Sequence, residues 1–332
     1  MSFDQNKNQD EILRRWTEKY RSELGPLLPF VDDPDVAEIW LNPNMNVWVT
    51  YLDGKGKVKT DIQIPPSQSN LLLRSIASRL GKTITEENPI LSGVLPDGSR
   101  FQGEIPPIVD RPSFNIRKKA VRIFTLDEYV ESGILSPDQR RVISEAIKNR
   151  KNILVVGGTG SGKTTLTNAI LQELATLDPK TRVVMIEDIP ELQCPVEDHV
   201  NFYVAQTERT DVSMDVLLRT TLRKTPDRIV VGEVRGKEAH VLLKAWSTGH
   251  PGGACTVHAD DAREGVQKIY DYANEAIVGQ INPKSVSRTV NLAVFISKTP
   301  TSPGRRVEEI VVIDGFRDGE FIVTPIETKG DS

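Results

Sequence analysis

The sequence GGTGSGKTTL at residues 157–166 contains the pattern G-x-x-x-x-G-K-[ST], which is typical of loops that hold the phosphate chain of a nucleotide. Glycines in such a loop let backbone N–H groups point inward around a phosphate, next to the positive end of the helix that follows. The cofactor-binding residues that this stretch predicts are Gly157, Gly158, Thr159, Gly160, Ser161, Gly162, Lys163, Thr164 and Thr165.

The elements on either side of this loop support the same interpretation. The apolar stretch KNILVV (151–156) predicts a short buried strand that leads directly into the loop, and TTLTNAILQELATL (164–177) predicts a helix behind it. In this setting we expect Lys163 to reach the β- and γ-phosphates of ATP and the hydroxyl of Thr164 to bind Mg²⁺.

Beyond the loop, helix and strand patterns alternate along the chain. Strands are predicted at RVVMIE (182–187), RIVVGE (228–233) and GACTVH (253–258), and helices at SMDVLLRTTLRKT (213–225), KEAHVLLKAWSTG (237–249) and 261–275. Continuous Val/Ile runs are typical of strands that are buried on both faces. The alternation predicts an α/β domain over residues 151–332, with a parallel sheet between two layers of helices and a final strand pair.

Residues 1–120 predict a smaller α+β N-terminal domain. Ile12, Trp16, Tyr20 and Leu24 recur every four residues and predict one face of a helix. Strands broken by turns, including an Asp-Gly turn at 53–54, are expected over 38–60, then a helix that closes at Gly81, a hairpin at 92–108 and a strand at 113–119.

A linker and a helix are expected at residues 121–150, between the two domains. Thr125 with Glu128, and Ser136 with Gln139, each have the spacing of a capping box at the start of a helix.

Carboxylates follow two of the predicted parallel strands, where a nucleotide in the loop would lie. Glu233 ends RIVVGE and is predicted to polarise the attacking water, directly or through Mg²⁺. Gly232 precedes it and has no side chain to contact a metal. Glu187 ends RVVMIE and is the best candidate of the cluster that also holds Asp188 and Glu191.

Histidine and arginine residues supply further candidates. His258 ends GACTVH, from where it could hydrogen-bond a phosphate or Glu233, although a lone histidine is more often structural. Cationic side chains stabilise the charge that develops in phosphoryl transfer. The arginines near the second acidic strand, for most of which a surface or ion-pair role is expected, are Arg209, Arg219, Arg223 and Arg228; two more, on predicted N-terminal strands, are Arg100 and Arg117.

Composition narrows the class of protein. A formal net charge of −4 over 332 residues argues against a dedicated nucleic-acid binder, so we expect no direct sequence-specific binding of nucleic acid. Two cysteines are too few for a disulfide scaffold or a four-cysteine zinc site, which fits a reducing cytoplasm. The sequence has no apolar signal core and no membrane-spanning stretch, so any membrane contact is expected to be peripheral and to depend on partners.

Four stretches together resemble the Walker A, Asp box, Walker B and His box of the secretion-superfamily ATPases, and most closely those of the type IV secretion traffic ATPases. They are GGTGSGKT, IEDIPEL, PDRIVVGEVRG and TGHPGGACTVHAD, and in that family Walker B has the Gly-Glu form seen at residues 232–233. EIWLNPNMNVWV and LPDGSRFQGEIPP resemble the family's N-terminal domain, so the resemblance spans nearly the whole chain.

The resemblance implies a RecA-like P-loop core that binds ATP and Mg²⁺, assembled as a homo-hexamer with other type IV secretion components at the inner membrane. It implies that Glu233 is the catalytic carboxylate, Glu187 the Asp-box carboxylate near Mg²⁺ and His258 the His-box residue. Arg100 and Arg117 match N-terminal arginines that approach the phosphates. The function it implies is a motor that powers conjugative transfer of DNA or protein, or pilus assembly.

Three alternatives stay open at this point. A pilus extension or retraction motor would use the same boxes. A RecA-like nucleic-acid motor would bind DNA in a salt-dependent manner. A nucleotide-gated scaffold would bind ATP without needing to hydrolyse it.

Overall fold

The computed structural model describes residues 3–51, 56–119, 122–207 and 210–326. They fold into two units, residues 1–121 and 122–332. The expected Asp-Gly turn at 53–54 and Arg209 lie outside the described residues. In the part of the chain that is described, no helix is long and apolar enough to cross a membrane.

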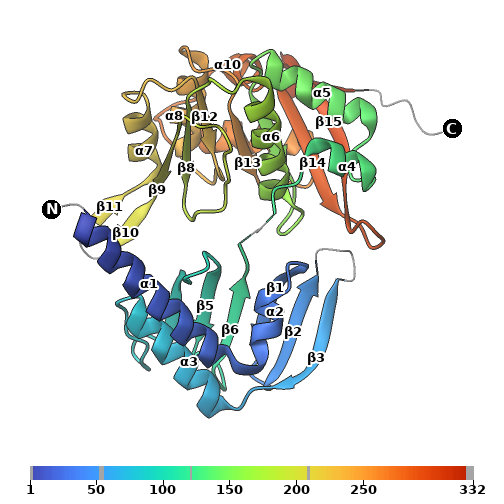
Figure 1. Cartoon of the computed structure of the whole chain (residues 1–332). Coiled ribbons are helices and arrows are strands. Elements are labelled where there is room, and N and C mark those ends of the chain that lie inside the picture. The colour runs from blue at the N-terminus through green and yellow to red at the C-terminus, as the bar shows by residue number, and fades with distance from the viewer. Residues whose placement is uncertain (1–2, 52–55, 120–121, 208–209, 327–332) are drawn as a thin grey trace. The chain divides into compact units, whose positions relative to one another are not determined.

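The first unit is a six-stranded sheet with helices, in the strand order β3-β2-β1-β6-β5-β4 (Figure 1). Its elements are α1 (Phe3–Leu24), a 3₁₀ turn (Gly25–Leu27), α2 (Leu28–Asp32), β1 (Val36–Leu41), β2 (Asn46–Tyr51), β3 (Lys57–Gln63), α3 (Pro66–Arg79), β4 (Ile90–Val94), β5 (Arg100–Glu104) and β6 (Ser113–Arg117). All neighbouring strands in this sheet are antiparallel.

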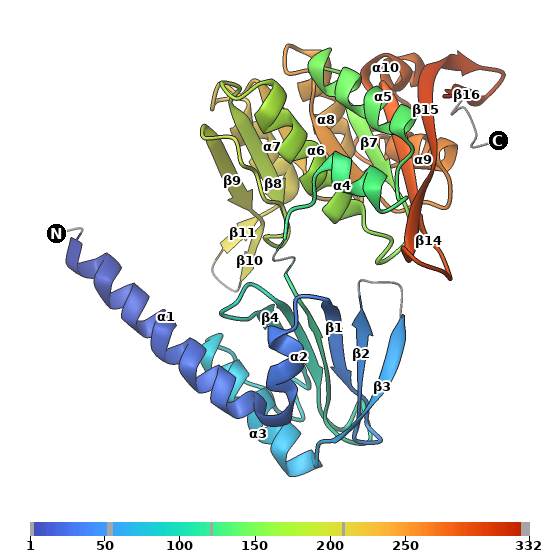
Figure 2. The ribbon, with the colours of Figure 1, turned by 45° about the vertical axis from the view of Figure 1, so that its right-hand side comes forward.

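Helices α1 and α3 lie along the sheet of this unit (Figure 2), and apolar side chains of the strands form one core with those of the two helices. Ile39 and Ile116, for example, are fully buried, as are Leu73 and Ile76 of α3. Helix α3 ends as the sequence predicts: Gly81 has a φ of +66° and the N–H of Lys82 returns to the carbonyl of Ala77. The predicted hairpin is also present, with β4 paired to β5 around Gly98 at φ +83°.

The second unit is built on an eight-stranded sheet in the order β16-β15-β14-β7-β13-β12-β8-β9. Its strands are β7 (Ile153–Val156), β8 (Val183–Glu187), β9 (His199–Tyr203), β12 (Arg228–Val231), β13 (Ala254–Val257), β14 (Leu292–Lys298), β15 (Arg305–Arg317) and β16 (Glu320–Pro325), with β10 (Ala205–Thr207) and β11 (Thr210–Val212) as a separate pair. The six strands from β14 to β9 run parallel, whereas β15 and β16 extend the edge as an antiparallel hairpin.

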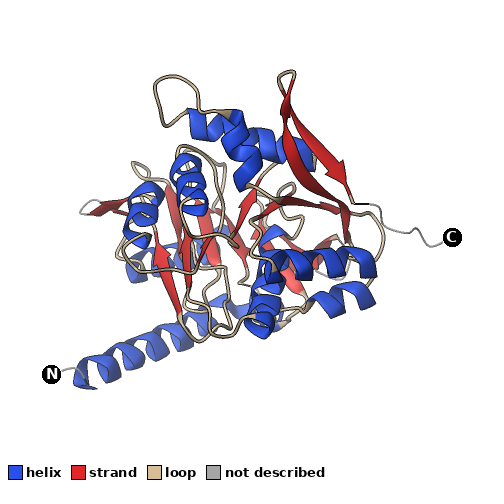
Figure 3. Ribbon diagram, turned by 90° about the horizontal axis from the view of Figure 1, so that it is seen from above, coloured by secondary structure: helices blue, strands red, loops and turns tan. Residues whose placement is uncertain are grey.

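Helices cover both faces of this sheet (Figure 3). They are α4 (Leu126–Glu131), α5 (Pro137–Lys148), α6 (Lys163–Leu177), α7 (Met214–Thr221), α8 (Glu238–Ser247), α9 (Ala262–Asn274) and α10 (Pro283–Thr289). Strand β7 shows the division of the core: Leu154 and Val156 pack with α7 to α10, whereas Ile153 and Val155 pack with α4, α5 and α6.

Residues 126–148, which the sequence sets apart as a linker and helix, pack inside the second unit. Both capping boxes are formed, with Thr125 accepting from the N–H of Glu128 and Ser136 from that of Gln139. Helix α5 has Ile143 and Ile147 in the same apolar core as α6.

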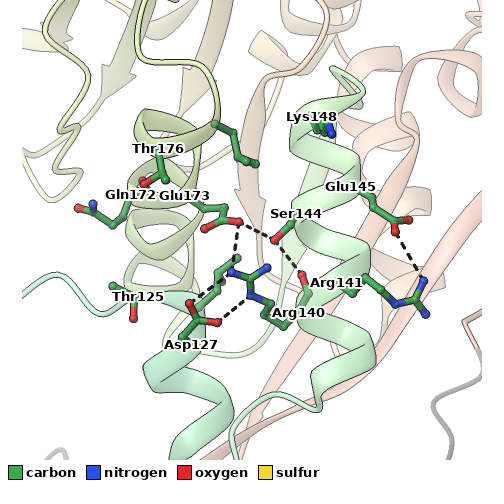
Figure 4. A pocket seen from close by; sticks show the side chains of 12 residues that line it. Thr125, Asp127, Arg140, Arg141, Ser144, Glu145, Lys148, Gln172, Glu173 and Thr176 are labelled. Atoms are coloured by element: carbon green, nitrogen blue, oxygen red, sulfur yellow. Dashed lines mark hydrogen bonds and ion pairs between the residues drawn. The ribbon is translucent and has the colours of Figure 1, made fainter.

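A polar pocket of about 440 Å³ lies between α4, α5 and α6 (Figure 4). Arg140 bridges Asp127 at 2.9 Å and Glu173 at 3.7 Å, and the hydroxyl of Ser144 donates to Glu173. Glu173 is ten residues along α6 from Lys163, roughly 15 Å at 1.5 Å per residue. Because its charges pair with one another far from the phosphate loop, this pocket joins the helices and is not a nucleotide site.

Arg228 is a buried structural residue and not part of the site. Its side chain is 2% exposed, and its guanidinium donates to the carbonyls of Ile147 and Gly252 and to the carboxylate of Asp178. Burial lowers the pKa of this guanidinium, and the hydrogen bond to Asp178 opposes that shift.

Replacing Arg228 with Ala is expected to lower the free energy of unfolding by about 3 kcal/mol, because it leaves a cavity and two carbonyls without their donor. Chemical denaturation followed by circular dichroism measures this change. The matched control is Arg219→Ala, because Arg219 makes an exposed pair with Asp215 four residues earlier, which is worth at most about 0.5 kcal/mol. Equal effects of the two substitutions would contradict the assignment.

Candidate functional site

The phosphate loop joins β7 to α6 as a tight, glycine-rich turn. Gly160 and Gly162 have φ of +68° and +104°, which favour glycine over other residues. A Cβ on Gly157 would lie 2.3 Å from the carbonyl oxygen of Ile296 on β14, so the loop can start only with glycine there. Helix α6 begins at Lys163, so the backbone N–H groups of its first turn, which have no partner within the helix, lie next to the loop.

Lys163 is folded back against its own loop in this structure. Its side chain is buried, with the residue 7% exposed, and Nζ donates to the carbonyls of Gly157 at 2.8 Å and Gly158 at 3.0 Å. Nζ also lies 3.2 Å from Nδ1 of His258. The ammonium group is thus held at the centre of the loop.

His258 and Glu233 come together at the ends of β13 and β12. Nε2 of His258 lies 2.9 Å from Oε1 of Glu233. Burial and the charge of Lys163 lower the pKa of His258, which favours the neutral ring. In the tautomer that fits these contacts, Nδ1 accepts from Lys163, and Nε2–H faces Oε1 of Glu233 without the alignment of a hydrogen bond. The three side chains therefore form one continuous chain of polar contacts.

Arg235 holds the other oxygen of Glu233. Its guanidinium donates to Oε2 of Glu233 and, at 3.3 Å, to Asp188. Burial of Glu233 raises its pKa, but the hydrogen bond and charge of Arg235, with the charge of Lys163, outweigh burial and lower it overall. Glu233 is therefore held as a carboxylate, the form that a general base needs.

Two of the three acidic residues of the Asp-box stretch, Glu187 and Glu191, have different surroundings. Glu187 is 2% exposed, and its Oε1 accepts from the backbone N–H groups of Glu191 at 2.9 Å and Leu192 at 2.7 Å. Glu191 instead accepts at 3.1 Å from the hydroxyl of Thr164, the expected Mg²⁺ ligand. Glu187 thus closes the turn that carries Glu191 to the loop.

Gly232 leaves room for Glu187. A Cβ at Gly232 would lie 3.1 Å from Cγ of Glu187, so a longer side chain there would press on that carboxylate. Thr256 also fixes this end of the sheet, because its hydroxyl donates to the carbonyl of Gly232 at 2.7 Å. A glycine before Glu233 therefore leaves space for the side chain of Glu187, at the end of the neighbouring strand β8.

Arg100 and Arg117 lie in the first unit, directly opposite each other on β5 and β6. Arg117 approaches Glu38 at 3.8 Å. Of the other histidines, His250 donates its Nδ1–H to the carbonyl of Pro226 and His199 donates its Nδ1–H to that of Val196, both within the second unit.

Two features of the site were not predicted from the sequence. The first is Arg235, which the spacing G-E-x-R could have indicated. The second is the pair Lys298 and Arg305, which come from the β14–β15 hairpin and lie beside Gly160 and Gly162. No local pattern links them to the loop, because the contact depends on β14 pairing with β7.

Comparisons with known proteins agree with this arrangement. Residues 21–295 match the family described as "Type II/IV secretion system protein". The chain is 40% identical over 309 residues to the conjugal transfer protein TrbB of Rhizobium radiobacter, covering 92% of this chain and 93% of the relative. It is 38% identical over 320 residues to the probable conjugal transfer protein TrbB of Sinorhizobium fredii, covering 96% and 95%.

A solved structure shows the same fold. The Legionella pneumophila ATPase DotB superimposes with a TM-score of 0.65 and 21% identity, covering 87% of this chain and 80% of that one. The chain therefore belongs to the type II/IV secretion system protein family, in which it is similar to the conjugal transfer proteins TrbB.

Proposed function

We propose that the chain is an ATP-hydrolysing motor that powers conjugative transfer of DNA or protein through a type IV secretion system. The observation that carries this proposal is the chain of contacts from Lys163 through His258 to Glu233, formed where the phosphate loop meets the ends of two parallel strands. The names of the similar conjugal transfer proteins support the biological setting.

The loop fits a chain of phosphates. Its glycine backbone and the first N–H groups of α6 offer hydrogen-bond donors to an anion, and the ammonium group of Lys163 lies at their centre. On binding ATP, Lys163 exchanges the carbonyls of Gly157 and Gly158 for the β- and γ-phosphate oxygens. The residues of the loop, Gly157 to Thr165, are the nucleotide-binding residues of the proposal.

Two hard oxygen ligands next to the loop fit Mg²⁺, namely the hydroxyl of Thr164 and the carboxylate of Glu191, which lie 3.1 Å apart. The described residues contain no group of three or more His, Cys, Asp or Glu side chains able to hold a metal ion. The phosphates and water would supply the remaining ligands, as is usual for Mg²⁺. When bound, Mg²⁺ neutralises negative charge that develops on the phosphate oxygens.

Glu233 acts as the general base in this proposal. It takes a proton from the water whose oxygen bonds to the γ-phosphorus, while the bond from that phosphorus to the β–γ bridging oxygen breaks and leaves ADP. His258 orients Glu233 and links it to Lys163. Arg235 has to release one oxygen of Glu233 so that it can accept the proton. Arg100 and Arg117 supply further positive charge, and Glu187 positions Glu191.

The second unit serves as a RecA-like ATPase core in the proposal, and the first unit as the part that hydrolysis moves. The protein works as a homo-hexamer in the cytoplasm, attached to the inner membrane through other secretion components. It makes no direct sequence-specific contact with nucleic acid, in keeping with its net charge of −4.

Plasmid mating tests this proposal. In a strain that lacks the chain's gene, the wild-type chain is expected to restore conjugative transfer, and Glu233→Gln, expressed at the same level, is not. Transfer restored equally by both would favour a nucleotide-gated scaffold. Unaffected transfer in the deletion strain, together with lost twitching, would favour a pilus motor.

A further inference from the structure

Two cationic side chains lie directly against the phosphate loop from the β14–β15 hairpin. A Cβ on Gly160 would lie 2.9 Å from Nζ of Lys298, and a Cβ on Gly162 would lie 2.8 Å from Nη1 of Arg305. The charged ends of both side chains therefore occupy the space beside two glycines of the loop. Strand β14 itself touches the loop, since a Cβ on Gly157 would lie 2.3 Å from the carbonyl oxygen of Ile296.

The two cations are neighbours of like charge. Lys298 and Arg305 are directly opposite each other in the antiparallel pairing of β14 with β15. Like charges at opposite positions of two strands destabilise a sheet. Neither side chain makes an ion pair with any carboxylate in the described ranges of the chain. The fold therefore keeps two positive charges together without neutralising them, beside a loop that is built for an anion.

We propose that Lys298 and Arg305 bind the phosphate chain of the nucleotide held by the loop of the same subunit. This inference rests on the proposed nucleotide site and extends it. Lys163 approaches the phosphates from within the loop, whereas Lys298 and Arg305 approach from the β14–β15 hairpin. A bound phosphate chain relieves the repulsion between the two cations. Arg305 adds a planar fork of donors that matches phosphate oxygens, and Lys298 adds a point charge.

Charge-removing substitutions of similar length test this proposal. Lys298→Met and Arg305→Met are each expected to weaken binding of a fluorescent ATP analogue, with Mg²⁺ present, by roughly tenfold, the effect of a lost hydrogen bond to a charged group. They are also expected to make binding less sensitive to salt, because exposed charges are screened. Fluorescence titration of the full chain at low and high salt measures both effects.

Charge-conserving substitutions separate phosphate binding from a role in shaping the loop. Lys298→Arg and Arg305→Lys are expected to keep most of the affinity. The matched control is Arg306→Met, because Arg306 is the exposed next residue of β15 and side chains alternate between the two faces of a strand. Its affinity is expected to equal that of the wild type.

Two results would overturn the inference while leaving the proposed function intact. One is wild-type affinity in both Met variants, with binding lost in Lys163→Ala. The other is equal loss in the Met and the charge-conserving variants, which would show that side-chain shape matters and charge does not. A wild-type chain that binds no ATP analogue would overturn the proposed function and this inference together.

Mixed assemblies test the assignment to the same subunit. Lys163→Ala and Arg305→Met chains are mixed and assayed for hydrolysis at low ATP concentration. If both cations serve one subunit's loop, no mixed site is complete, and the activity is the sum of the two separate variants. Activity above that sum would show that Arg305 completes a neighbour's site and would contradict the assignment.

Discussion

Glu233→Gln is expected to lower the kcat of ATP hydrolysis by about a thousandfold, within the range that a general base contributes. The amide oxygen of glutamine still accepts from Arg235, and the amide NH2 group takes the place of the oxygen that lies 2.9 Å from His258. The amide takes no proton from water, so only the chemical step is lost. Phosphate release under saturating ATP measures kcat, and titration with a fluorescent ATP analogue is expected to give an unchanged affinity.

The matched control for this substitution is Glu145→Gln, an exposed residue of α5 that pairs with Arg141 at 3.6 Å. Its kcat is expected to equal that of the wild type. A Glu233→Gln chain that turns over ATP within threefold of the wild type would show that another group activates the water.

Lys163→Ala is expected to weaken ATP binding by roughly a hundredfold, because the ammonium group provides charge-assisted hydrogen bonds to two phosphates. Turnover should then be undetectable. The fold should survive, since water can hydrate the carbonyls of Gly157 and Gly158 that Lys163 now contacts. Equilibrium titration gives the affinity, and circular dichroism checks the fold.

Lys151→Ala serves as the control, because Lys151 is an exposed lysine just before β7 in the same unit. It should bind ATP like the wild type. Affinity retained in Lys163→Ala would mean that the loop binds phosphate by its backbone alone, and circular dichroism that shows an unfolded chain would contradict the expected survival of the fold.

Much of the second unit could be predicted because its chemistry follows local patterns. The alternation of apolar runs with amphipathic stretches predicted β7, β8, β12 and β13, and the structure confirms that these strands are parallel. Parallel strands end at one edge of a sheet, so Glu233 and His258 were expected to lie near the loop. In the structure, Nε2 of His258 lies 2.9 Å from Oε1 of Glu233.

The position of the β14–β15 hairpin beside the phosphate loop could not be predicted from the sequence pattern. The apolar run at 292–296 and the Asn-Pro pair at 282–283 are signals for β14 and α10, but they carry no sign that β14 pairs with β7. That pairing brings Lys298 and Arg305 to the loop. Such contacts join residues more than 130 positions apart and depend on the tertiary fold.

The division of labour between the acidic residues also depends on tertiary contacts. Glu187 and Glu191 have the same side-chain chemistry, so the sequence separates them only by position. The sequence favours Glu187 for the site because it ends a predicted strand. Two backbone N–H groups of the following turn hold Glu187, whereas Glu191 reaches Thr164. The turn geometry that decides between them is not visible in residue spacing.

The measurement that tests the account most directly is phosphate release by the purified full-length chain supplied with ATP, with and without Mg²⁺. The Glu233→Gln chain, purified in the same way, sets the background from contaminating enzymes. The account predicts Mg²⁺-dependent release by the wild type far above that background. Release that equals the Glu233→Gln background, at concentrations where the chain assembles, would contradict it.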